Sequence, residues 1–186
     1  QSVNEGLKRL EIKSFLAVDQ ELYAGTGDGV YRPRGADDRW VPVTAGLDDT
    51  LVHSLARAAD GTLFAGTSGK GIFRLTPRSS GWVRVRHGLK DHEGMIENFI
   101  RVLVIDEDQS IFAGTFDGGV FRSIDGGLTW RPISRALPND SIRGIVLSDQ
   151  EVVVATGHGI FKTTDKGKQW MPLNRGLTNL SIQVLL

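Results

Sequence analysis

Residues 123–130 read SIDGGLTW, and the order of residues in this stretch predicts a closed hairpin turn. The side chain of Asp125 can accept hydrogen bonds from backbone N–H groups two or more residues further on. Gly127 can adopt a positive φ at no steric cost, and Thr129 and Trp130 restart a strand that carries a large apolar ring toward a core. We therefore expect a strand, a turn locked by its own side chains, and a second strand.

The motif recurs further along the chain. Residues 163–170 read TTDKGKQW, which keeps the hydroxyl of Thr163, the carboxyl of Asp165, Gly167 and Trp170. The four tryptophans stand at positions 40, 82, 130 and 170, so they are spaced by 42, 48 and 40 residues. A recurring period of this length indicates a repeat architecture.

Each tryptophan lies in the same frame of short apolar runs. A run with a small-residue centre, such as LFAGT from Leu63, precedes it, and a Gly-Leu or Ala-Leu step and a run such as IRVLV from Ile100 follow it. Units of about 40 to 50 residues with four strands are typical of β-propeller blades. The frame predicts one propeller domain over residues 1–186. Its repeats are expected at approximately 12–47, 52–89, 100–137 and 142–177, with partial blade strands at both ends.

The repeat resembles the Asp-box, or bacterial neuraminidase, repeat. Units with runs such as LFAGT, GGVFRS and DGGLTW are similar to the blades of photosystem II assembly-factor-like and sortilin-like propellers. The resemblance covers the whole chain, although the units around Trp40 and Trp82 lack the Asp-x-Gly of the motif. It implies an all-β fold of four complete, four-stranded antiparallel blades. These form either a closed four-bladed ring, or part of a larger ring or of a ring that partner chains complete.

We interpret the two motifs as structural rather than catalytic. Asx turns and buried tryptophans account for every residue type in them. The residues of this interpretation are Ser123, Asp125, Gly127, Thr129 and Trp130 in the third unit, and Thr163, Asp165, Gly167 and Trp170 in the fourth.

The composition excludes several classes of function. The chain has 22 basic and 22 acidic residues, so its formal net charge is zero and no overall field attracts nucleic acid or an anionic membrane. No apolar run approaches the roughly 20 residues of a membrane-spanning helix. Cysteine is absent, which removes disulfides, thiolate catalysis and cysteine-ligated metals. The cellular compartment stays open, with a periplasmic or secreted location slightly preferred to the cytoplasm.

Basic side chains recur at the second position of the innermost strand of each unit. They are Lys13, His53, Arg101 and Arg143, and their neighbours are apolar. Because the first strand of a propeller blade lies nearest the axis, we expect these side chains to ring the mouth of a central channel. A basic ring between low-dielectric walls concentrates anions even when the net charge is zero. The alternative is that the charged heads only solvate the strand ends.

One connection is longer than its counterparts. Residues 90–99 read KDHEGMIENF, about six residues more than the equivalent connection after Asp48. We expect this loop to form the rim of the basic site, with His92 and Glu93 on it, because loops on a rigid scaffold often carry function. The spacing of these residues matches no recognised metal-ligand pattern.

The sequence favours a non-enzymatic binding or scaffold module for a protein or for an anionic or glycan ligand, with no cofactor and no catalytic residues. Sialidases share the repeat, but the only tyrosines are Tyr23 and Tyr31, both in strands, and no Arg-Ile-Pro signature is present. A fragment of a glycan-active hydrolase, sialidase-like or xyloglucanase-like, stays an alternative, since a carboxylate pair about 5 to 10 Å apart cannot be placed from sequence. A self-assembling structural propeller is a second alternative.

Overall fold

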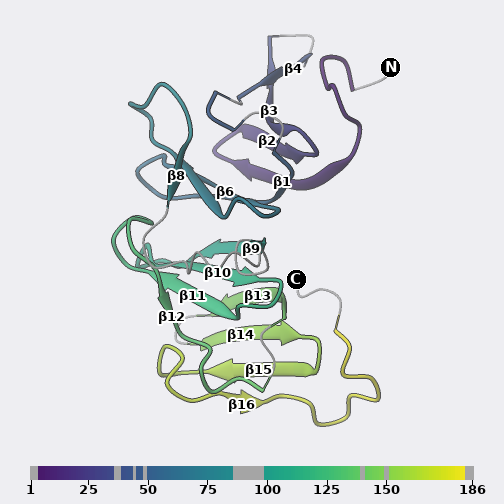
Figure 1. Cartoon of the computed structure of the whole chain (residues 1–186), viewed down its shortest axis with the longest axis vertical. Helices are drawn as coiled ribbons and strands as arrows, with labels where there is room; N and C mark the ends of the chain where they lie inside the picture. The colour runs from purple at the N-terminus through teal and green to yellow at the C-terminus, as the bar shows by residue number, and fades with distance from the viewer. Residues whose placement is uncertain are drawn as a thin grey trace.

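A computed structural model describes residues 4–35, 39–43, 45–47, 50–85, 99–138, 141–148 and 151–182. These residues form sixteen strands in four antiparallel sheets, and none of them is helical (Figure 1). The first sheet holds β1 (Ile12–Val18), β2 (Glu21–Thr26), β3 (Gly29–Arg34) and β4 (Arg39–Pro42), and the second holds β5 (Val52–Arg57), β6 (Leu63–Thr67), β7 (Ile72–Leu75) and β8 (Val83–Val85). The third sheet holds β9 (Ile100–Ile105), β10 (Ile111–Thr115), β11 (Val120–Ser123) and β12 (Arg131–Pro132), and the fourth holds β13 (Ile142–Ser148), β14 (Glu151–Thr156), β15 (Gly159–Thr163) and β16 (Met171–Pro172).

The four sheets are the blades of an open arc. In each blade the strands follow chain order, and the first strands pack on one another in succession, β1 on β5, β5 on β9 and β9 on β13. The blades fan out from these inner strands, and the first and last blades point in opposite directions (Figure 1). The predicted all-β fold of four antiparallel blades is confirmed. Of the two arrangements that the sequence left open, the closed four-bladed ring is not the one observed.

The blades pack through seams in which a strand glycine meets an inner strand of the next blade. A Cβ on Gly66 would lie 2.6 Å from Cγ2 of Ile100, and a Cβ on Gly114 would lie 2.5 Å from Cγ2 of Ile142. Any larger side chain would force the blades apart, because a well-packed core does not absorb an added methyl group. The repeated Ala-Gly-Thr of the second strands is therefore a packing requirement.

Two of the tryptophans tie neighbouring blades together. The indole Nε1 of Trp82 donates a hydrogen bond to the carbonyl of Val43 at 2.6 Å, and Nε1 of Trp170 donates to the carbonyl of Ile133 at 3.0 Å. In both cases the acceptor belongs to the preceding blade. The indole therefore fills a seam and satisfies its polar atom there.

The SIDGGLTW turn is closed by its own side chains. Oδ1 of Asp125 accepts hydrogen bonds from the hydroxyl of Ser123 at 2.8 Å and from the N–H groups of Leu128 and Thr129 at 3.1 and 2.9 Å, and Oδ2 accepts from the Thr129 hydroxyl at 2.6 Å. Gly127 has a φ of 77° and donates its N–H to the Ser123 hydroxyl. In the fourth blade, Asp165 accepts hydrogen bonds from Thr163 and from the N–H of Gln169 in the same way, and Gly167 again donates to the hydroxyl of residue 163.

None of the described residues forms a helix of the length and apolar character that a membrane span requires.

Candidate functional site

The four basic residues of the inner strands each occupy a β-bulge. In β1 the pairing register passes from Ile12 to Ser14 against consecutive residues of β2, which leaves Lys13 as the extra residue. The same shift leaves His53, Arg101 and Arg143 unpaired in the other three inner strands. A bulge bends the strand and redirects the side chain of its extra residue. The repeat therefore places one basic side chain out of register in every blade, and we call these four residues the inner column.

The two middle members of the inner column lie in a cluster with two phenylalanines. The ring of His53 lies 4.5 Å from that of Phe99, and Phe99 lies 5.5 Å from Phe116, measured between ring centroids. The guanidinium carbon of Arg101 stands 4.2 Å from the centroid of Phe116 and 5.9 Å from that of Phe99. Both distances are within the range of cation–π contacts, which favour the placement of a guanidinium over an aromatic face.

The charges of the inner column act on one another. Burial lowers the pKa of His53 below its ordinary value of 6.5, and the positive charges of Lys13 and Arg101 lower it further against a smaller opposing effect of Glu11. Burial, followed by the charge of Arg143, also lowers the pKa of Arg101. These couplings run along the inner strands from one blade to the next. His53 and Arg101 therefore each lie within the electrostatic influence of a neighbouring member of the inner column.

The middle members have unused hydrogen-bonding capacity. Among the described residues, the buried Nε2 of His53 has no hydrogen-bond partner and no carboxylate pairs with Arg101. The end members are engaged: Nζ of Lys13 lies 2.5 Å from a carboxylate oxygen of Glu11, and Nη1 of Arg143 donates to the hydroxyl of Ser181 and the carbonyl of Ile182. An anion would therefore find its partners between the second and third blades.

The predicted rim falls outside the described residues. His92 and Glu93 belong to residues 86–98, for which no structure is described. In the part of the chain that is described, no group of three His, Asp or Glu side chains is arranged to hold a metal ion.

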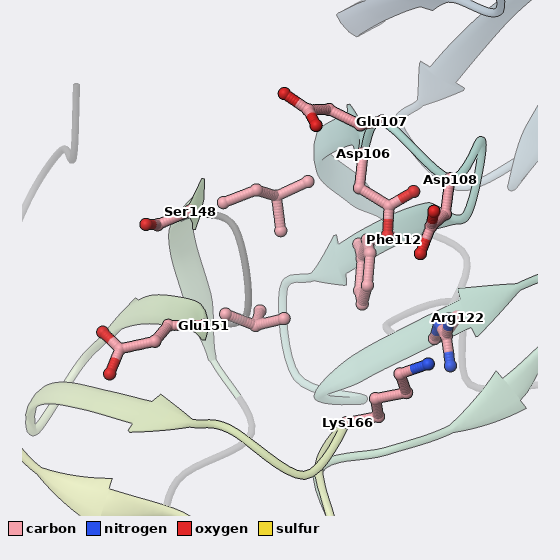
Figure 2. Close-up of a pocket in the computed structure, with 10 residues that line it drawn as sticks. Asp106, Glu107, Asp108, Phe112, Arg122, Ser148, Glu151 and Lys166 are labelled. Carbon is pink, nitrogen blue, oxygen red and sulfur yellow. The ribbon is translucent and has the colours of Figure 1, made fainter.

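A second concave site lies at the seam of the third and fourth blades (Figure 2). The cavity measures about 210 Å³ and combines carboxylates from the turn after β9 and from the first residue of β14 with the side chains of Phe112, Arg122 and Lys166. In the view of Figure 2, the carboxylates of Asp106 and Asp108 lie above the ring of Phe112, and the side chains of Arg122 and Lys166 lie below it. The cavity can hold a small polar molecule that carries charges of both signs.

Sequence reasoning missed this cavity and the two that resemble it. Arg122 belongs to a basic row in the third strands, which includes Arg32 and Arg74, and each of these arginines lines a cavity at a different seam. Arg122 stacks on Phe112 at 5.5 Å and donates to the hydroxyl of Ser110. The sequence of one blade does not reveal these cavities, because each is formed by two blades together.

Comparison with known proteins identifies the fold. The chain matches no protein-family model, and no curated protein matches it. The extracellular domain of BT4673, assigned as a hybrid two-component system of B. thetaiotaomicron, aligns with 95% of the chain at 18% identity and a TM-score of 0.79. An ancestral GH74 enzyme aligns with 95% of the chain at 17% identity and a TM-score of 0.78. YCF48 bound to a D1 peptide aligns with 90% of the chain at 15% identity and a TM-score of 0.63. The fold is a β-propeller.

The chain is shorter than each of these propeller structures. It spans 24% of the BT4673 chain, 27% of the ancestral GH74 enzyme and 55% of YCF48. At such low identities the likeness is one of fold alone, and function must be argued from the sites.

Proposed function

We propose that the chain is a non-enzymatic binding module that holds an anionic group of a protein or a glycan at the inner ends of its blades. The observation that carries the proposal is the cluster at the two middle bulges, where Arg101 stacks on Phe116 and the buried Nε2 of His53 has no partner among the described residues. A planar guanidinium fixed against a ring is suited to carboxylate, sulfate or phosphate oxygens. Lys13 and Arg143 extend the positive potential along the same inner edge.

The other parts of the chain have supporting roles in this proposal. Residues 1–186 act as one propeller unit, and the turns at residues 123–130 and 163–170 are Asp boxes that brace its blades. The loop with His92 and Glu93 forms the rim of the site. The similarity to YCF48, whose structure contains a D1 peptide, favours a ligand presented by a protein.

The proposal is tested with a fluorescein-labelled octaglutamate peptide and fluorescence polarisation. We expect binding that weakens as salt rises, because charges more than a Debye length of about 8 Å apart are screened at physiological ionic strength. Arg101→Ala should weaken binding about tenfold or more, as loss of a charge-assisted hydrogen bond does. Arg131→Ala removes the same charge from the exposed outermost strand β12 and is the matched control.

An octaglutamine peptide of the same length controls for contacts that do not involve charge. Equal affinity for the two peptides, or equal losses in the Arg101 and Arg131 variants, would contradict the proposal.

A fragment of a glycan-active hydrolase is the second candidate. It is favoured by the carboxylates of Asp106, Asp108 and Glu151 around the seam cavity, because glycoside hydrolysis uses two acids that flank the scissile bond. Release of fluorophore from a panel of fluorogenic glycosides, abolished by Asp106→Asn or Glu151→Gln, would support it. No release from any member of the panel would remove it.

A further inference from the structure

Each seam between blades joins two unlike halves. The preceding blade contributes a strand glycine and the leucine of the Gly-Leu or Ala-Leu step, and the following blade contributes apolar residues of its inner strand. The glycine contacts the first of these inner-strand residues: Gly25 meets Val52, Gly66 meets Ile100 and Gly114 meets Ile142. The seam is one interface used three times within the chain.

The outer face of the first blade has the inner-strand residues that a following blade contributes to a seam, but no other described blade packs against it. Ile12 and Phe15 occupy the positions that Ile100 and Leu103 occupy in the third blade. At the second of these positions, Leu55, Leu103 and Ile145 are 8%, 5% and 4% exposed, whereas Phe15 is 62% exposed. The first blade therefore presents the apolar residues of a seam to solvent.

The outer face of the fourth blade has the other half of a seam, the half that a preceding blade contributes. Ala155 stands where the other blades have their strand glycine, and it is fully buried. Part of this face is therefore already covered, and a blade that packs here must shift to accommodate the Ala155 methyl group. At the leucine position, Leu47 and Leu137 are 1% and 9% exposed, whereas Leu177 is 39% exposed. Leu173 on the same blade is also exposed.

One glycine of the fourth blade has the same backbone conformation as its counterpart in the first seam. Gly46 has a φ of 84° and packs on the backbone of Trp82 in the next blade. Gly176 is its counterpart and has a φ of 86°, but no atom lies within 4 Å of the position of its Cβ. At Gly176 the fourth blade therefore has the backbone conformation of the first seam, and no atom of the described residues occupies the space beside it. Elsewhere on this blade Arg143 donates hydrogen bonds to residues 181–182, so a docking blade must also displace these two residues.

We propose that the fourth blade of one copy of the chain packs on the first blade of a second copy, so that two copies close a ring of eight blades. The two exposed faces are complementary halves of an interface that the chain already uses three times. The first and last blades point in opposite directions, so one chain takes up half of a ring (Figure 1). Propellers typically have about 4 to 8 blades, which two copies satisfy and three exceed. Each copy then contributes both halves, and the ring contains two identical seams related by a twofold axis.

A short segment of the same chain competes for this interface. The N–H of Trp40 donates to the carbonyl of Glu5 at 2.9 Å, as the N–H of Trp82 donates to the carbonyl of Ala45 at 2.7 Å. Gly6, with a φ of 97°, packs on the backbone of Trp40 in the way that Gly46 packs on Trp82. Residues 4–7 therefore fill part of the face that a second copy would cover, and docking must displace them.

The first test is the mass of the full chain in solution by light scattering after size exclusion. We expect a concentration-dependent species of twice the 20.3 kDa chain mass. Phe15→Glu and Leu177→Glu should each weaken the association about tenfold or more, because a carboxylate would be buried without a partner. A mixture of the two variants should associate again, since one seam of the mixed pair lacks both substitutions.

The second test uses one substitution at two equivalent glycines. Val tolerates a positive φ poorly, so Gly6→Val should release residues 4–7 from Trp40 and strengthen the association. Gly176→Val should weaken it, because the seam conformation of the fourth blade is lost. Circular dichroism of each variant verifies that the strands are retained.

Several outcomes would overturn the proposal. A wild-type chain that is monomeric at every concentration would leave these faces to blades from another polypeptide. If Phe15→Glu and Leu177→Glu each associate with themselves but not with each other, then the first blade packs on a first blade and the fourth blade packs on a fourth blade. A weaker association for Gly6→Val would mean that residues 4–7 support the interface rather than compete for it. Arg101 lies on neither face, so Phe15→Glu and Leu177→Glu leave the proposed anion site of a single chain intact, and failure of one proposal can be distinguished from failure of the other.

Discussion

Asp125 shows how a single side chain holds a hairpin of the propeller. It accepts four hydrogen bonds within its turn, from Ser123, Leu128 and Thr129. We predict that Asp125→Ala lowers the free energy of unfolding by about 1 to 2 kcal/mol, as loss of hydrogen bonds to a charged group does. Urea denaturation measures the change. Asp117→Ala, at an exposed position on a neighbouring turn, is the control and should have little effect.

The same carboxyl makes stability depend on pH. Burial raises the pKa of Asp125, but the hydrogen bonds from Thr129, Ser123 and Leu128 outweigh it and lower the pKa from 3.8 to about 2. A folded-state pKa below the unfolded value adds stability that is present above about pH 4 and is lost as the pH falls toward 2. The slope of stability against pH in this window should be shallower in Asp125→Ala than in the wild type. An unchanged slope would show that other carboxyls account for the acid sensitivity.

Gly114 tests the packing of a seam. A Cβ at this position would lie 2.5 Å from Cγ2 of Ile142 and 2.6 Å from Cγ1 of Val102. We predict that Gly114→Ala lowers the free energy of unfolding by about 1 to 3 kcal/mol, the usual effect of overpacking. The double variant with Ile142→Ala should lose less than the sum of the two single losses, because the second change makes room for the first. Strict additivity in urea denaturation would contradict the close contact.

At the scale of the strand, the bulge places one basic residue out of register in each inner strand. His53 is the one such residue that titrates near neutrality, and its pKa lies below 6.5 because of burial and the charges of Lys13 and Arg101. A His with a lowered pKa binds fewer protons folded than unfolded, so stability should decrease as the pH falls below about 6.5. We predict that His53→Phe removes this decrease between about pH 6.5 and 5. Thermal unfolding at matched pH values is the measurement, and an equal decrease in both proteins would contradict the prediction.

The strands were the most predictable part of the molecule. In the third blade, alternating apolar residues bounded by turn residues predict the positions of the strands. The strands β9, β10 and β11 lie where that pattern indicates them. The Gly of Ala-Gly-Thr lies where side chains of the next blade come close, such as Ile100 beside Gly66 and Ile142 beside Gly114. Local pattern suffices here because each blade is one short, consecutive stretch of the chain.

The site was less predictable because its features depend on pairing between strands and between blades. The sequence indicated that Arg101 and its counterparts are unusual, but a bulge is a matter of register, which the hydrophobic pattern alone does not specify. The stacking of Arg101 on Phe116 joins an inner strand to a turn between other strands. The seam cavities combine residues of two blades, as Asp106 and Lys166 do. No single repeat contains both partners of a seam cavity.

At the scale of the whole molecule, the proposed ring and the proposed site support one another. One chain carries a single inner column along half of a ring, with its end members Lys13 and Arg143 held by Glu11 and by residues 181–182. A second copy would bring a second inner column to the same mouth. Because potentials from like charges around a low-dielectric opening add, anion affinity should be higher in the paired form than in a single chain.

An arc of blades also predicts a gradient of local stability along the chain. Each blade in a repeat protein is stabilised mainly by its neighbours, so a middle blade with two seams resists opening more than an end blade with one. We predict that amides of β6 and β10 exchange with solvent more slowly than amides of β2 and β15 in the Phe15→Glu variant, which removes pairing between copies. Hydrogen exchange read out by mass spectrometry measures this order. In the wild type at high concentration, protection of β2 and β15 should rise toward that of the middle strands, since every blade of a closed ring has two seams. Equal exchange of all four strands in the variant would show that the arc opens only as a whole, and would contradict the gradient.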